Sequence, residues 1–475
     1  MFMKKSNPKN NQSHVVFLTF ASFLVCVVVF SYVCSEYGLA GFSYLSVSAY
    51  LGSFRPLGPT NSDPCTGKYI FVHQLPRKFN SHLLHRCQTL SYHMKDMCVY
   101  LQNSGFGPPL FENASGDGVF RAGSWFATDQ FTLEVIFHSR MKQYKCLTND
   151  SSSADALFVP FYAALEAGRN LEGQSIAVRD KVPTELLNYM SSQKEWKVME
   201  GRDHFLVAGR IAWDFRRSMD NDSFWGNKFM NLPQAEHIKM LTIESTTYHE
   251  NEAAIPYPTY FHPSSADEIR QWQKVVAREK REYLFSFAGA PRPWQKSIRG
   301  EVISQCLAAP SECILISCKD MTDKKCHSPL SVLKLFRSSN FCLQPPGDSP
   351  TRRSTFDSII SGCIPVFFDL KSGPEQYTWY FPSNYTNYSV YIPHEDVKAN
   401  KTDIRKVLSR IPAADVKAMR SQVIKMIPRV IYTNRRRGSE DIEKDAFDIA
   451  VEGILNRVAA IKTEFRRGKK SDSHL

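Results

Sequence analysis

Short apolar runs alternate with helix-like stretches along most of this chain. Lys68 to His73 reads KYIFVH, which is typical of a buried strand, whereas Phe131 to Tyr144 has the apolar spacing of a helix. Further strand-like runs occur at 156–161, 204–208, 283–288, 314–317, 340–343 and 364–368. Strands that alternate with helices indicate βαβ units and a mainly parallel sheet, so we expect an α/β fold.

The alternation is interrupted at Ile255 to Pro263, where three prolines prevent regular strand pairing. This break divides the region into two α/β halves. Open parallel sheets bind ligands in the cleft outside the carboxyl ends of their strands. We therefore expect the functional residues at those strand ends.

The first residues predict a membrane anchor. Three lysines precede the uncharged run from Val15 to Val33, which is long enough to cross a hydrocarbon core of roughly 30 Å. Because the lysines come first, the positive-inside rule places the beginning of the chain in the cytosol and the rest in a lumen or outside the cell. A cleaved signal peptide is the alternative, but its apolar region is usually shorter, about 7 to 15 residues. We expect a cytosolic tail at 1–14, an anchor at 15–33 and a stem at 34–64.

Roughly 400 residues follow the stem, which exceeds a single hydrophobic core and suggests two domains. We expect these domains at 65–270 and 271–461, followed by a polar tail at 462–475. The net charge of +12 raises the question of nucleic acid binding. A lumenal location excludes that partner, and the spread of charge along the chain leaves a few arginines to meet an anionic ligand.

Cysteine use indicates an oxidising compartment. Ten cysteines lie between Cys65 and Cys363, an even number, and their spacings fit no standard zinc pattern, so we expect disulfides. Glycosylation triplets, which matter only in the secretory pathway, agree with this. They begin at Asn113, Asn149, Asn221, Asn384, Asn387 and Asn400.

The most informative stretch is Phe341 to Phe368, which reads as strand, loop, helix, glycine stop and strand. Its loop carries Ser349, and Arg352, Arg353 and Ser354 stand at the start of the helix. A helix N-terminus offers free N–H groups, and guanidinium groups match phosphate oxygens, so this segment predicts a diphosphate site. It is neither a GxxxxGK[ST] loop nor a GxGxxG loop.

The role of Asp357 stays open at this point. Ser354 and Asp357 have the spacing of a helix capping box, which competes with a role for Asp357 in ligand contact. A second basic cluster, Arg292, Lys296 and Arg299, follows the run at 283–288. Its alternatives are a solvated helix face and a second side of the same diphosphate site.

The first half offers five residues for acid or base chemistry: Asp129, Glu134, Asp203, His204 and Asp214. Three of them are candidates for the general base: Asp129, His204 and Asp214. Each also has a structural interpretation, as a helix cap, a hydrogen-bonded core histidine and a partner of a neighbouring arginine, respectively. Tyr260 and His262 lie among the prolines near the expected cleft. Rings with polar edges suit the faces of a sugar, so both are candidates for binding an acceptor sugar, and core packing is the equal alternative.

The sequence Asp220-Asn221-Asp222 has the spacing of a divalent-metal motif. It overlaps a glycosylation triplet and follows charged residues, so we expect an exposed loop there. No metal site is predicted, because arginines can neutralise a departing diphosphate.

Several long motifs resemble the exostosin-like glycosyltransferases, and within them the plant xyloglucan galactosyltransferase group. They include WFATDQFTLEVIFHSRM (125–141), ALFVPFYAAL (156–165), GRDHFLVAGRIAWDFRR (201–217), IPYPTYFHP (255–263), LFSFAGAPRP (284–293) and FCLQPPGDSPTRRSTFDSIISGCIPVFF (341–368). The resemblance covers nearly the whole chain from Cys65 to about Ile461.

The resemblance implies a GT-B-like fold with two Rossmann-like domains facing a cleft, the first on the acceptor side and the second binding the nucleotide sugar. It implies an inverting enzyme that transfers β-linked galactose from UDP-galactose to xylosyl branches of xyloglucan without a cofactor. It also implies a Golgi membrane location, with complexes with other glycosyltransferases as further partners. Asp357, six positions before Cys363, matches an acidic position that sits at the nucleotide in this family. The arginine pattern before it differs from that of other branches, so Arg292, Ser349, Arg352, Arg353 and Ser354 are donor-binding candidates from the predicted diphosphate site alone.

Four other functions stay open. Relatives of the same group imply galacturonosyl or arabinosyl transfer to the same polymer. A non-catalytic glycan-binding or scaffold protein would bind UDP or glycan without transfer. A glycoside hydrolase would instead need two carboxyl groups across the sugar, roughly 5 to 9.5 Å apart, and no diphosphate site.

Overall fold

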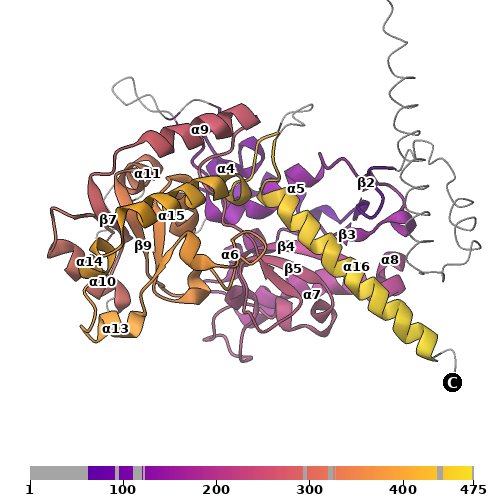
Figure 1. Ribbon diagram of the computed structural model, residues 1–475. Coiled ribbons are helices and arrows are strands. Elements are labelled where there is room, and N and C mark those ends of the chain that lie inside the picture. Colours follow the sequence, from indigo (N-terminus) through magenta and orange to yellow (C-terminus); the bar gives the residue numbers. More distant parts are fainter. Residues whose placement is uncertain are drawn as a thin grey trace, which may run out of the picture. The chain divides into compact units, whose positions relative to one another are not determined.

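Two parallel sheets dominate the computed structural model, which describes residues 63–90, 96–110, 120, 123–291, 297–318, 325–326, 328–435 and 442–472 (Figure 1). The predicted tail, anchor and nearly all of the stem lie outside these residues, as do Arg292, Lys296 and Asn113. No helix within the described ranges is both long and apolar enough to cross a membrane. Residues 65–475 group as one compact unit.

The first sheet has six parallel strands in the order β2-β1-β3-β4-β5-β6. They are β1 (Ile70–Val72), β2 (Leu147–Thr148), β3 (Ala156–Phe158), β4 (His204–Ile211), β5 (Lys239–Glu244) and β6 (Glu252–Ala254). The helices of this half are α3 (Ser81–His85), α4 (Met97–Tyr100), α5 (Leu133–Met141), α6 (Ala163–Asn170), α7 (Ile176–Ser192) and α8 (Lys194–Met199).

The second sheet has five parallel strands in the order β11-β10-β9-β7-β8. They are β7 (Tyr283–Gly289), β8 (Cys313–Ser317), β9 (Ser339–Gln344), β10 (Ile364–Phe367) and β11 (Val390–Tyr391). Its helices are α9 (Ala266–Arg278), α10 (Ile298–Leu307), α11 (Pro329–Arg337), α12 (Arg353–Ile360), α13 (His394–Lys398), α14 (Ile404–Ser409) and α15 (Ala413–Met426). Two parallel sheets in one α/β arrangement confirm the predicted fold class.

The last helix, α16 (Ala446–Asp472), follows the second half in sequence but packs on the first (Figure 1). The ring of Phe447 lies 4.7 Å from that of Phe137 on α5. Arg457 and Lys462 donate hydrogen bonds to the carbonyl oxygens of Glu252 (2.9 Å) and Ala154 (3.0 Å). Residues 462–472, where we expected a polar tail, continue this helix.

Five disulfides join all ten cysteines from Cys65 onward, which confirms disulfides over a zinc site. One of them, Cys342–Cys363, connects β9 to the residue before β10 across 21 residues and so fastens both ends of the segment that was predicted to bind diphosphate. The other four are Cys65–Cys146, Cys87–Cys98, Cys306–Cys313 and Cys318–Cys326.

Removal of the Cys342–Cys363 bridge is expected to lower the free energy of unfolding by about 3 kcal/mol, because the bridge reduces the conformational entropy of the unfolded chain. The comparison is denaturant unfolding of the wild type and of Cys342→Ala/Cys363→Ala. The control is Cys318→Ala/Cys326→Ala, which opens a loop of only 8 residues and should cost less. An equal or larger loss in the control would contradict the expectation.

Candidate active site

The loop between β9 and α12 gathers arginines from two elements. The amide of Gly347 donates to the carbonyl oxygen of Ser349 (3.1 Å), and Arg352 donates to the Ser349 hydroxyl (3.1 Å). Arg299, on α10, donates through Nε to the carbonyl oxygen of Pro346 (3.2 Å). The space that a side chain on Gly347 would fill is occupied by guanidinium nitrogens of Arg352 and Arg299. The second basic cluster thus reaches the predicted diphosphate loop through Arg299.

Arg353 connects this loop to the first half of the chain. Its Nη1 donates to the carbonyl oxygen of Thr128, and its guanidinium carbon lies 3.6 Å from the ring centroid of Tyr260, a close cation–π contact. Its Nε lies 3.5 Å from Asp357 Oδ2. Nε and Nη2 are buried and make no hydrogen bond to any described residue. Arg353 therefore keeps donors available at the boundary between the halves.

The start of α12 settles the alternative of a capping box. The residue before the helix is Arg352, which makes no side-chain cap, and the Ser354 hydroxyl donates instead to Gln344 Oε1 (2.6 Å). Asp357 is only 3% exposed, and its Oδ1 has no hydrogen-bond partner among the described residues. Burial raises the pKa of Asp357 to about 6, against the opposing charge of Arg353.

Other buried polar atoms near the start of α12 are also unsatisfied within the described chain. Gln344 Nε2, at the end of β9, and Thr355 Oγ1, on α12, have no hydrogen-bond partner there. Each residue is 1% exposed. Buried polar groups are nearly always paired, so this concentration indicates a place where a polar ligand completes the hydrogen bonds.

The loop is also tied to the carboxyl end of the first sheet. Thr351 donates to Glu244, the last residue of β5, from its amide (2.7 Å) and its hydroxyl (2.6 Å). The hydroxyl group of Tyr257 lies 3.0 Å from that of Thr351. The loop thus lies where the strand ends of the first sheet meet the second half, as expected for a cleft in this fold.

The structure separates the three candidate bases. The Asp129 carboxylate accepts a hydrogen bond from the Phe131 amide (2.9 Å). Asp129 directly follows Thr128, whose carbonyl oxygen accepts a hydrogen bond from Arg353. Asp214 follows β4, where its carboxylate accepts from Trp225 Nε1 (2.7 Å) and lies 3.3 Å from Arg210 Nε. Burial raises the pKa of Asp214, although Arg210 and Trp225 oppose the shift.

His204, the third candidate, is the first residue of β4, whereas Asp214 follows the other end of that strand. It is fully buried, its Nδ1 lies 2.8 Å from Asp203, and its ring stacks on that of His73 at 5.0 Å. This placement favours the interpretation of His204 as a core histidine.

The two acceptor candidates also differ in placement. Tyr260 lies beneath the guanidinium of Arg353. His262 is fully buried, and its ring nitrogens face Thr128 Oγ1 (2.8 Å) and the carbonyl oxygen of Tyr432 (2.7 Å). His262 therefore positions the segment that carries Thr128, and Tyr260 is the one beside the donor loop.

Glu134 is a further candidate of the sequence for acid or base chemistry. It accepts hydrogen bonds from the amides of Ala164 (2.5 Å) and Gly209 (3.0 Å), and burial raises its pKa to about 8. Sequence reasoning missed Glu244 and Gln344. Their signal was their position, because Glu244 and Gln344 end strands of the two sheets.

The two carboxylates of Asp220-Asn221-Asp222 contact neighbouring protein groups outside the candidate active site. Asp220 pairs with Arg217 (3.0 Å) and Lys228, and Asp222 accepts the Ile176 amide (2.6 Å). Both carboxylates thus hold the surface loop in place. No group of three or more His, Cys, Asp or Glu residues suited to a metal occurs in the part of the chain that the structure describes.

Residues 64–407 match the exostosin GT47 domain. The chain belongs to the exostosin GT47 family. The xyloglucan galactosyltransferase MUR3 of Arabidopsis thaliana is 50% identical over 86% of this chain and 65% of its own length, so the match spans just under two thirds of that relative. The probable xyloglucan galactosyltransferase GT14 of the same plant is 51% identical over 85% of this chain and 77% of its own. A xyloglucan-specific galacturonosyltransferase of Arabidopsis thaliana is 39% identical over 83% and 58%, respectively.

Solved structures are more distant from this exostosin GT47 chain. The GtfA/B complex gives a TM-score of 0.34 with 11% identity over 69% of this chain and 60% of that chain. TarM gives a TM-score of 0.31 with 11% identity over 69% and 58%.

The raised pKa of Asp357 predicts a pH-dependent stability of this exostosin GT47 domain. Its pKa of about 6 exceeds the ordinary value of 3.8, so folding favours the protonated acid. The resulting stabilisation is complete below about pH 4 and is lost as the pH rises to about 6. Asp357→Asn mimics the neutral acid at every pH and so lacks this pH-dependent loss. As the pH rises from about 4 to 6, the unfolding free energy of the variant should therefore increase relative to that of the wild type, by up to about 3 kcal/mol. Denaturant unfolding at pH 4.5 and 7 tests this, and a constant difference would contradict it.

Proposed function

We propose that this chain is an inverting, UDP-sugar-dependent glycosyltransferase that adds β-linked galactose from UDP-galactose to xylosyl side chains of xyloglucan. The observation that carries the proposal is the set of unsatisfied donors on Arg353 and Gln344 beside Arg299 and Arg352, at the start of a helix. Forked cations and free helix amides are the groups that bind a diphosphate. The names of the similar Arabidopsis proteins supply the sugar and the acceptor in this proposal.

The proposed reaction is a single in-line displacement. An acceptor hydroxyl attacks the anomeric carbon, its proton passes to a base, and the bond from that carbon to the UDP oxygen breaks. Arg299, Arg352 and Arg353 stabilise the charge that develops on the departing UDP, and Asp357 Oδ1 is free to accept a hydrogen bond from the nucleotide. We assign the base to Asp129 or Asp214. Asp129 follows Thr128, which Arg353 contacts, and Asp214 lies beyond the carboxyl end of β4. His204 lies at the start of that strand, away from the loop.

The decisive experiment is a panel of UDP-galactose, UDP-galacturonic acid and a UDP-arabinose donor on xyloglucan oligosaccharides, with the product linkage determined by NMR. We expect β-galactosylation of xylose. Transfer of galacturonic acid or arabinose would change the proposed donor but would still support a glycosyltransferase. Thermal stabilisation by UDP without transfer would support a scaffold protein, and cleavage of oligosaccharide without donor would support a hydrolase.

We also propose a single-pass type II location in the Golgi membrane with the catalytic region lumenal, near other glycosyltransferases of the polymer. The predicted anchor and the five disulfides support it. Protease treatment of intact Golgi vesicles should spare the region from Cys65 onward, and digestion before detergent is added would refute this.

A further inference from the structure

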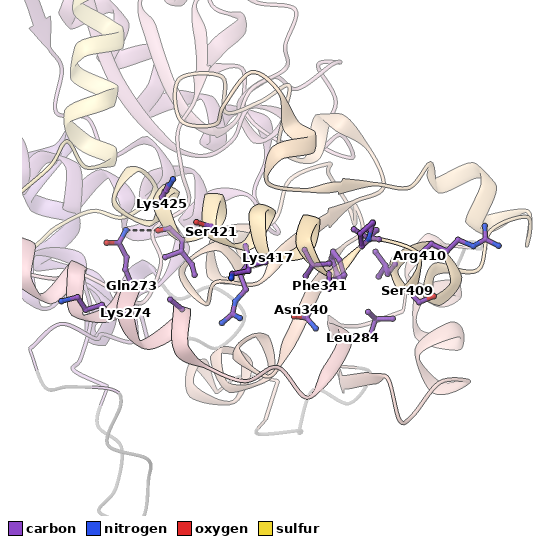
Figure 2. A pocket seen from close by; sticks show the side chains of 18 of the residues that line it. Gln273, Lys274, Leu284, Asn340, Phe341, Ser409, Arg410, Lys417, Ser421 and Lys425 are labelled. Atoms are coloured by element: carbon purple, nitrogen blue, oxygen red, sulfur yellow. Dashed lines mark hydrogen bonds between the residues drawn. The ribbon is translucent and has the colours of Figure 1, made fainter.

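A groove of about 1100 Å³ lies between α9 and α15 in the second half (Figure 2). Arg270, Lys274 and Ala277 line it from one face of α9, and Val416, Lys417 and further residues at helical spacing line it from α15. Gln273 Nε2 on α9 donates to the carbonyl oxygen of Ile424 on α15 (2.9 Å) and links the two walls. The groove is therefore formed by two helix faces that are fixed to each other.

The groove lies away from the candidate active site. Its floor includes Leu284 and Asn340, the second residues of β7 and β9. The arginine-rich loop follows Gln344, at the other end of β9. An occupant of the groove would therefore leave the active site open.

The groove has a basic rim, in which Arg270 is paired with Asp267 on its own helix (2.6 Å). Five of its six basic residues are exposed, and the sixth, Arg420, is fixed by the carbonyl oxygens of Val276 and Glu279. None of the residues that line the groove in the described chain is acidic. The six basic residues are Arg270, Lys274, Arg410, Lys417, Arg420 and Lys425.

The floor is aliphatic. Its side chains include Leu284, Ile411, Val416 and Ile424. The aromatic residue that lines it, Phe341, is fully buried in the core and offers no free ring face to a sugar. A concave aliphatic floor inside a cationic rim matches an amphipathic helix with aliphatic side chains on one side and carboxylates beside them.

We propose that this groove binds an acidic amphipathic segment of a partner protein. Aliphatic side chains of the segment fill the floor, and its carboxylates pair with Lys274 on α9 and Lys417 on α15. The complementary charge governs which segment is accepted, and it makes binding weaken as salt rises. This assignment is independent of the transferase reaction.

The test uses the full lumenal region and a labelled synthetic helix with Leu at positions i, i+3, i+4 and i+7 and Glu beside them. Fluorescence anisotropy should show saturable binding that weakens with salt. Lys274→Glu/Lys417→Glu should weaken it roughly tenfold or more, because each reversal replaces an attraction with a repulsion. The matched control is Lys142→Glu/Lys181→Glu, which reverses two exposed lysines outside the groove and should bind as the wild type does.

Two further ligands decide the class of occupant. A scrambled peptide of the same composition should bind at least about fivefold more weakly, because its leucines no longer share one face. Oligogalacturonate, an anionic glycan, should also bind more weakly than the helix. Absence of saturable binding, equal binding of the scrambled peptide, equal loss in the control variant, or tighter binding of the oligogalacturonate would each overturn the proposal.

Discussion

Arg353→Met is expected to lower kcat/KM for the UDP-sugar by roughly 10²- to 10³-fold, because it removes preformed donors from the departing diphosphate. In the wild type this guanidinium contacts Thr128 and Tyr260 and retains two buried donors without a protein hydrogen bond among the described residues. Methionine keeps the length of the chain over the Tyr260 ring but supplies no donor. The measurement is initial-rate kinetics together with the shift in melting temperature that UDP produces, which should largely disappear.

Loss of the cation leaves Asp357 buried without its charge partner, so lower stability could mimic lower activity. Arg353→Met/Asp357→Asn removes that charge as well and should recover stability but not transfer. The matched control is Arg337→Met, since Arg337 is also buried, pairs with Glu279 and lies 5.6 Å from the Trp272 ring. Arg337→Met should have a lower melting temperature than the wild type and an unchanged KM for the UDP-sugar. Normal transfer in Arg353→Met would remove this side chain from the donor site.

Gly347→Ala should lower kcat/KM roughly a hundredfold with little change in melting temperature, because losing a positioned donor to the diphosphate costs about that much. The added methyl group would take the place of the guanidinium ends of Arg352 and Arg299, which can swing outward at little cost to folding. Gly347 has an ordinary negative φ, so alanine strains no backbone there.

Gly300→Ala is the matched control for this prediction. Gly300 follows Arg299 directly, yet an added methyl group there would only approach the Ser297 hydroxyl, at 3.8 Å. It should therefore leave donor kinetics unchanged. A comparable fall in activity in Gly300→Ala, or wild-type kinetics in Gly347→Ala, would contradict the idea that two arginines converge on Gly347.

The main strands were predictable because they are short apolar runs between helical patterns, a signal that survives without tertiary information. Strand β5 (KMLTIE) was missed because its apolar run is short and has a charged residue at each end. Strands β2, β6 and β11 were missed because they have only two or three residues each. Such strands depend on pairing with a neighbour, and pairing is a tertiary property.

The candidate site was predictable in part. The loop of Arg352 and Arg353 was found because basic residues before a helix carry a local signal. The contact of Arg353 with Tyr260 and Thr128 joins positions more than 90 residues apart, so local sequence could not show it. The capping-box interpretation of Asp357 was wrong, because Arg352 occupies the position before α12, and Ser354, which the box requires there, lies within the helix.

The return of α16 to the first sheet limits how specificity could be exchanged between related enzymes. A chimera that takes everything after residue 264 from a relative would import a foreign helix onto α5, where Arg140 and Asp445 lie 3.4 Å apart. A graft of residues 265–444 alone would keep the native helix with its own sheet. On the proposed function, an exchange of nucleotide-sugar preference between such proteins therefore needs two junctions, one before α9 and one before α16.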